Sequence, residues 1–193
     1  KELVTIGKIW ELAQLDRKVK SGRKYDLVIV DAPATGHGIG FLQTPRTFAA
    51  IARVGPIHSQ AQQLDRLITD HEHTGTAIVA LQEEMPVNES AALEHELRTE
   101  VGVAVDRVYL NGLYPERFSK EEAERLAELA EGENGIVRAA ARAATSEHGR
   151  ARSQRAQLAR LRRRVEAPVK TLPFLFEPEL DVEAARQLAR RLH

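Results

Sequence analysis

Apolar side chains recur every three or four residues in several segments of the chain, and this spacing predicts amphipathic helices. The predicted helices cover residues 2–19, 44–54, 57–71, 88–100, 120–132, 136–165 and 182–192. Short continuous apolar runs, rich in β-branched residues, lie between some of these helices and predict strands. The predicted strands cover residues 25–30, 76–81, 107–111 and 169–172.

The alternation of strands with helices predicts an α/β fold. Parallel strands need long crossover connections, which the helices supply, and continuously apolar strands suit a sheet that is covered on both faces. We therefore expect a mostly parallel sheet flanked by helices on both faces. The length of 193 residues, without an internal repeat or a linker, fits a single domain over residues 1–193.

Several helix starts carry side chains that can cap them. Ser119 and Glu122 have the spacing of a capping box, which predicts a helix directly after them. Asn88 and Asp181 are also residue types that accept hydrogen bonds from the first N–H groups of a helix. We expect them to cap the helices that follow.

Composition narrows the range of functions. The chain has no cysteine, which excludes disulfides, thiolate nucleophiles and zinc–thiolate sites. Its formal net charge of zero does not bear on nucleic-acid binding, but aromatic residues make up only 5%, which disfavours a base-stacking surface, and we expect no nucleic-acid partner. No apolar stretch is long enough to span a membrane, and residues 1–20 do not form a signal peptide. We therefore expect a cytoplasmic location and no transmembrane segment.

Candidate chemistry lies at the carboxyl ends of predicted strands, where open parallel sheets bind their ligands. Asp31 directly follows the strand at residues 25–30 and precedes a glycine-rich loop at residues 32–40. A carboxylate in this place suits Mg²⁺ beside phosphates, and glycines let the backbone approach a phosphate closely. Asn111 ends another predicted strand, and its amide can both donate to and accept from the edge of a base.

Other polar clusters have plainer interpretations. Gly36, Gly38 and Gly40 suggest a dinucleotide-binding loop, but their spacing is G-x-G-x-G rather than G-x-G-x-x-G. Residues Asp70–His73 include metal-ligand types, and we expect them in an exposed loop before a strand. We expect Glu94–Glu96 to be a solvated helix face.

A longer motif surrounds Asp31. Residues 25–38 read Tyr-Asp-Leu-Val-Ile-Val-Asp-Ala-Pro-Ala-Thr-Gly-His-Gly. This segment resembles the switch II region of the ArsA and guided-entry ATPases, the anion-transporting ATPases of the deviant P-loop class, whose pattern is D-x-A-P-T-G-H-T before a leucine-rich helix. Val108–Leu113 is similar to the strand end of that family that carries an asparagine. Leu172–Pro178 is similar to its P-L-L-x-x-E loop, which closes over the adenine.

The resemblance, over about residues 25–192, implies ATP and Mg²⁺ as cofactors. It implies that Asp31 holds Mg²⁺ through water and that the loop up to Gly38 senses the γ-phosphate, so that a switch helix beginning near Phe41 moves at a dimer interface. The residues implied for catalysis are Asp31, Thr35, Gly36 and His37, and those implied for nucleotide binding are Asp31, Pro33, Asn111, Pro173, Phe174 and Leu175. The implied partners are an ArsA-like subunit in a homo- or heterodimer and a protein partner or membrane channel.

The sequence also departs from the family pattern. The phosphate-binding loop G-K-G-G-x-G-K-T does not occur, the chain begins with Lys1, and its single methionine is Met85. We therefore expect the C-terminal part of an ArsA-like ATPase domain, with the N-terminal strand and the P-loop outside this sequence. Without cysteines, neither the metalloid site nor the C-x-x-C zinc site of the family can form from this chain.

Three functional hypotheses follow. The first is an ATP-binding and ATP-hydrolysing domain of an ArsA-like ATPase, inactive as this chain alone. The second is a catalytically degenerate structural or regulatory subunit that pairs with an active ATPase partner. The third, a dinucleotide-dependent oxidoreductase, needs an acidic residue after a second strand and has little support in the sequence.

Overall fold

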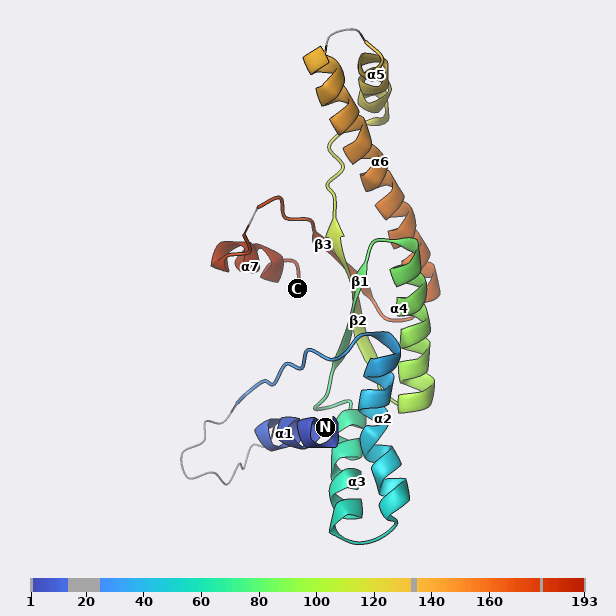
Figure 1. Cartoon of the computed structure of the whole chain (residues 1–193), viewed down its shortest axis with the longest axis vertical. Helices are drawn as coiled ribbons and strands as arrows, with labels where there is room; N and C mark the ends of the chain where they lie inside the picture. Colours follow the sequence, from blue (N-terminus) through green and yellow to red (C-terminus); the bar gives the residue numbers. More distant parts are fainter. Residues whose placement is uncertain (1, 14–24, 133–134, 178, 193) are drawn as a thin grey trace. The chain divides into compact units, whose positions relative to one another are not determined.

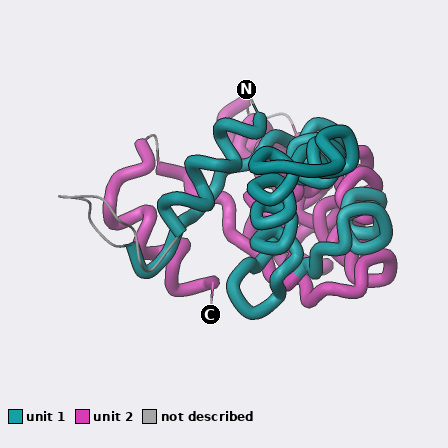
Figure 2. The backbone as a smooth tube through the Cα atoms, turned by 90° about the horizontal axis from the view of Figure 1, so that it is seen from below, with its two compact units in different colours: residues 1–76, 92–105 teal, residues 77–91, 106–193 magenta. Residues whose placement is uncertain are grey.

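The computed structural model describes residues 2–13, 25–132, 135–177 and 179–192. The chain divides into two compact units, which Figure 2 draws in two colours. Unit 1 comprises residues 1–76 and 92–105, and unit 2 comprises residues 77–91 and 106–193. Helix α4 (Glu84–Glu96) contributes residues to both units.

Unit 1 is built from helices. Helix α1 (Glu2–Ala13) packs against α2 (Thr35–Ala52) and α3 (Pro56–Thr69), which form a helical hairpin. Gly55 turns the chain between α2 and α3 with a φ of 98°, and Pro56 takes the first helical position, where an N–H has no intrahelical partner. The apolar core of the hairpin and α1 contains Ile6, Ile39, Phe41, Ala61, Leu64 and Ile68.

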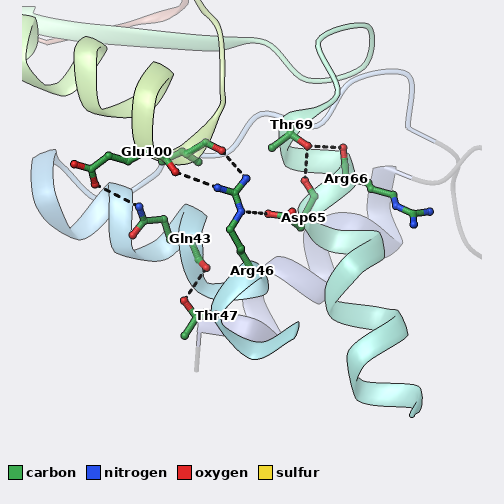
Figure 3. A network of polar contacts seen from close by, with 8 residues as sticks. Gln43, Arg46, Thr47, Asp65, Arg66, Thr69 and Glu100 are labelled. Carbon is green, nitrogen blue, oxygen red and sulfur yellow. Dashed lines mark hydrogen bonds and ion pairs between the residues drawn. The ribbon is translucent and has the colours of Figure 1, made fainter. Parts of the chain in front are cut away.

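Arg46 on α2 joins this hairpin to η1 (Leu97–Val101), a π-helical turn that continues α4 (Figure 3). Its Nη1 donates to the carbonyl of Glu100 at 3.1 Å, and its Nη2 donates to the carbonyl of Val101 at 3.0 Å. Its Nε lies 3.5 Å from the carboxylate of Asp65 on α3. Since the last carbonyls of a helix lack intrahelical partners, Arg46 satisfies groups that η1 leaves open.

Unit 2 contains nearly all of a three-stranded sheet in the order β1 (Thr76–Leu81), β2 (Val105–Leu113) and β3 (Val169–Pro173). β2 and β3 run parallel, with Val108 opposite Val169 and Leu110 opposite Thr171. The helices of this unit include α5 (Lys120–Ala130), α6 (Gly135–Arg164) and α7 (Val182–Ala189). In the view of Figure 1, α6 and α7 lie on opposite sides of the strands. The fold is therefore α/β, with a parallel sheet flanked by helices, as the sequence predicts.

The core of unit 2 lies between the sheet and its longest helix. Val108 and Leu110 of β2 are fully buried, together with Leu161 of α6 and Val87 of α4. α5 packs against α6 as a second hairpin. Because α6 supplies both Leu161 and the contact with α5, it connects the sheet to that hairpin.

Most elements of unit 2 are confirmed. The capping box is present: Ser119 Oγ accepts from the N–H of Glu122 at 3.2 Å, and the N–H of Ser119 donates to Glu122 Oε2 at 2.7 Å. Asp181 caps α7 by accepting from the N–H of Ala184 at 2.8 Å. The prediction for Asn88 is wrong, because α4 begins at Glu84 and the Asn88 side chain accepts a hydrogen bond from Arg164.

The predicted strand at residues 25–30 is wrong. These residues have no helical or strand structure, and Leu27 and Ile29 are 73% and 85% exposed. An apolar run becomes a strand only where a neighbouring strand accepts its backbone hydrogen bonds, and the described part of the chain supplies no such neighbour to it.

The prediction of a glycine-rich loop at residues 32–40 is correct only in part. Residues 32–34 are irregular, but α2 begins at Thr35 rather than near Phe41. Each glycine weakens a helix by about 1 kcal/mol relative to alanine. Burial of Ile39 and Phe41 favours the helix in spite of this penalty.

Three smaller findings concern helices. Residues 14–19 of the predicted first helix lie outside the described residues. Glu94 is buried rather than solvated, and its carboxylate lies 4.0 Å from Arg98. None of the helices that the structure describes is both long and apolar enough to cross a membrane.

We expect Leu161→Ala to lower the free energy of unfolding by about 2–5 kcal/mol, because it leaves a cavity in the core of unit 2. Leu129→Ala, at an exposed position of α5, is the matched control and should change it by less than about 0.5 kcal/mol. Urea unfolding followed by circular dichroism measures both. Equal effects would contradict the assigned core.

Arg46→Met should lower the free energy of unfolding by about 1–2 kcal/mol, because it leaves the carbonyls of Glu100 and Val101 without their charged donor. The control is Arg66→Met, because Arg66 is an exposed arginine of α3, and Figure 3 shows it beside the Arg46 network. Hydrogen exchange at η1 should quicken in the first variant and stay unchanged in the second. Unchanged exchange in both would show that Arg46 does not hold η1.

Candidate functional site

The segment with the ATPase-like motif enters α2 at its N-terminus. Asp31 lies in the irregular stretch before the helix, and Thr35, Gly36 and His37 form its first turn. All four residues are exposed. The first N–H groups of an α-helix have no intrahelical acceptors, and together with the helix dipole they favour an anion. The structure thus keeps these predicted catalytic residues together on one short segment.

The backbone of this segment is tightly folded at two points. A Cβ added to Gly38 would lie 2.5 Å from the carbonyl oxygen of Pro33, so only glycine fits there. Thr35 has a φ of 45°, which is uncommon for a β-branched residue. Such strain gathers at functional sites, and here it marks the point where the chain turns from Asp31 into α2.

The donors available at Asp31 fit Mg²⁺ as it is usually held beside a nucleotide. Asp31 is exposed in the irregular stretch before α2, so a hydrated ion can reach its carboxylate oxygens. Mg²⁺ in nucleotide sites keeps several waters and takes one or two protein carboxylates, with phosphates filling the remaining positions. One exposed carboxylate is therefore a sufficient contribution from this segment.

A second group of candidate residues lies in unit 2, at the carboxyl ends of β2 and β3. A cavity of about 320 Å³ opens there, near the lower end of the range of about 300–1,000 Å³ for small-molecule sites. Its lining residues are Leu113, Tyr114, Pro115, Arg117, Arg155, Thr171, Leu172, Pro173, Phe174, Phe176 and Arg191. The cavity therefore combines aromatic rings with guanidinium groups.

The aromatic rings of the cavity form one cluster. The rings of Tyr114 and Phe174 are stacked, with centroids 4.9 Å apart and planes 9° apart. Phe176 meets both edge-on, at 5.5 Å from Tyr114 and 4.9 Å from Phe174. The guanidinium of Arg117 lies 5.1 Å from the ring centroid of Phe176. Planar aromatic and guanidinium surfaces are what a planar base stacks on.

The structure brings together only some of the predicted base-contacting residues. Pro173 and Phe174 line the cavity. Asn111 is half-buried in β2, and among the described residues that line the cavity neither it nor Leu175 is present. Gly112, beside Asn111, has a φ of 76° and approaches the side chain of Gln82, at the end of β1.

Sequence reasoning missed Tyr114, Arg117, Arg155, Phe176 and Arg191, which also line the cavity. The alternation of aromatic residues in Phe174-Leu175-Phe176 was a usable signal, because it places two rings on one side of an extended chain. No local sequence pattern marked Arg155 of α6 or Arg191 after α7 as cavity residues. They reach the cavity only through the tertiary fold.

The acidic and histidine run before β1 is a turn, as predicted. Ligand atoms of Asp70, Glu72 and His73 lie within 4.8 Å of one another on the surface, while His71 is exposed outside this group. The backbone N–H of Glu72 and the side chain of His73 donate to Asp70 and hold the pKa of its carboxyl below the usual value. These hydrogen bonds account for the cluster without a metal ion.

Comparison with known proteins agrees with the motif. The family model described as anion-transporting ATPase matches residues 2–55. Similar relatives include ATPase BagA of Mycobacterium tuberculosis and a Mycobacterium bovis protein that is named as an ATPase, each 30% identical over 134 residues. The match covers 69% of this chain and 37% of each relative. The chain therefore belongs to the anion-transporting (ArsA) ATPase family.

Proposed function

We propose that this chain is the nucleotide-responsive part of an ATP-hydrolysing protein that uses ATP and Mg²⁺. The observation that carries the proposal is the cavity in which Pro173 and Phe174, from the adenine-loop motif, meet Tyr114. Family membership supports the general ATPase role. Because the matched part spans 37% of the relatives, the proposed hydrolysis is an activity of the whole protein.

In unit 2 the proposal assigns base binding to the cavity residues. Phe174 is 40% exposed, so part of this residue remains accessible to a ligand although its ring stacks on Tyr114 and meets Phe176. Asn111, on β2 outside the cavity lining, is the residue that the family resemblance assigns to the base edge, since its amide both donates and accepts. Arg117 and Arg155 also line the cavity, but they form ion pairs with Glu147 and Glu116, so an anionic ligand would compete with these carboxylates for them.

In unit 1 the proposal assigns phosphate chemistry to the segment before α2. When bound, Mg²⁺ neutralises charge on the phosphates during phosphoryl transfer. Asp31 would hold it through water, the Thr35 hydroxyl would orient a water molecule, and the first N–H groups of α2 would bind phosphate oxygens. His37 would take part in reshaping this segment when the phosphate leaves.

Arg46 offers a route by which α2 transmits the nucleotide state within unit 1. It bonds to the end of η1 and pairs with Asp65 on α3, so a shift of α2 either moves these elements or breaks the contacts (Figure 3). Such a shift would change the surface offered to a second ArsA-like subunit, in a homo- or heterodimer, or to a protein partner such as a membrane channel.

We expect Phe174→Ala to weaken ADP binding by the full-length protein by about tenfold, because it removes the stacking surface. Phe48→Ala is the matched control, since Phe48 is 41% exposed on α2 and should leave the affinity unchanged. Isothermal titration calorimetry with ADP and Mg²⁺ measures both. Unchanged affinity in the Phe174 variant would refute the base-binding role of the cavity.

Asp31→Asn should abolish ATP hydrolysis by the full-length protein without lowering its melting temperature, because the side chain is exposed. Asp26→Asn, an exposed aspartate in the same segment, should keep the wild-type rate. Phosphate release is the measurement. Activity in the Asp31 variant would show that the assignment is wrong, and nucleotide binding without hydrolysis by the wild-type protein would favour a degenerate subunit instead.

A further inference from the structure

The chain leaves the sheet at Tyr114, where α6 takes over its backbone hydrogen bonds. The carbonyl of Leu113, the last residue of β2, still accepts from the N–H of Phe174 at 2.8 Å. The N–H of Tyr114 donates instead to Oε1 of Gln154 at 2.8 Å. Its carbonyl accepts from Nη2 of Arg155 at 3.3 Å. Two consecutive residues of α6 thus hold both backbone groups where the strand ladder stops.

The two helix side chains are themselves held in place. Gln154 is one of the few polar side chains buried among the described residues, so water does not compete for its hydrogen bond to Tyr114. Arg155 is oriented by the carboxylate of Glu116, 3.5 Å from its Nε. The Gln154 contact with Tyr114 is therefore buried in the fold, whereas the Arg155 contact lies nearer the surface.

Clamping the backbone of Tyr114 also fixes its ring, and the ring fixes the cavity. Tyr114 stacks on Phe174 and meets Phe176 edge-on. Displacing the Tyr114 backbone would move the surface on which these rings rest. A base that stacks on Phe174 would then meet a Phe174 ring that Tyr114 no longer holds in place.

We propose that Gln154 is a positioning residue for base binding: it sets the place of Tyr114, and through Tyr114 the place of the Phe174 ring. Gln154 is not among the residues that line the cavity, and the Tyr114 N–H connects it to the cavity. This inference rests on the proposed role of the cavity in binding the base.

The test compares Gln154→Leu with Gln154→Glu in the full-length protein. Leucine removes the acceptor, and we expect it to weaken ADP binding by about five- to tenfold, since a misplaced stacking surface loses part of its contact. Glutamate keeps an acceptor oxygen at the same reach and should restore the affinity to within about twofold of the wild type. Calorimetry with ADP and Mg²⁺ gives the affinities, and near-ultraviolet circular dichroism reports the tyrosine environment.

Gln157→Leu is the matched control. Gln157 lies one turn further along α6, and its Oε1 is buried without a hydrogen-bond partner among the described residues. Its loss should leave ADP affinity and the tyrosine signal unchanged. If Gln154→Leu does not fold, Gln154→Met also removes the acceptor while keeping the length of the side chain, and it should weaken ADP binding in the same direction.

The outcomes separate this inference from the proposed function. Wild-type affinity in Gln154→Leu, or no recovery in Gln154→Glu, would overturn the positioning role. If Phe174→Ala weakens ADP binding while Gln154→Leu does not, only the positioning role fails. If Phe174→Ala leaves ADP affinity unchanged, the proposal that the cavity binds the base is itself wrong.

Discussion

Backbone groups at the ends of helices and strands need new hydrogen-bond partners, and long polar side chains supply them in both units. In unit 1, Arg46 donates to the last carbonyls of η1. In unit 2, Gln154 and Arg155 hold the N–H and the carbonyl of Tyr114. In each case the side chain comes from a helix distant in sequence, so one contact both completes a hydrogen-bond ladder and fixes where a candidate functional segment lies.

Close backbone packing limits the same segments. Gly38 lies against the carbonyl of Pro33, and any side chain there would push the Asp31 segment away from the start of α2. Gly112 adopts a φ of 76° directly after Asn111, and it lies beside the Gln82 side chain at the end of β1. Both glycines therefore serve geometry rather than flexibility: Gly38 permits α2 to approach Pro33 closely, and Gly112 permits a left-handed backbone within β2, where the register with β3 shifts.

The sequence predicted elements whose signals are local, and it failed where distant contacts decide. Ser119 and Glu122 lie three residues apart and form their capping box within a single turn, so the start of α5 was predictable. Residues 25–30 carry the same apolar signal as β1, yet a strand needs a neighbour that no local pattern can specify. The motif identified Pro173 and Phe174, whereas Tyr114, Arg155 and Gln154 owe their roles to where α6 crosses the end of β2.

The helical state of the glycine-rich segment bears on how α2 could respond to a nucleotide. Gly36, Gly38 and Gly40 each lower the stability of a helix by about 1 kcal/mol relative to alanine, so the first turns of α2 are its least stable part. Beyond them, burial of Phe41 and the contacts of Arg46 hold the helix to the rest of unit 1. Unwinding the first turns would lengthen the loop after Asp31 towards the one that the sequence pattern predicts. The low intrinsic helix stability of this segment would suit the proposed switch, which requires a loop and a helix of similar free energy.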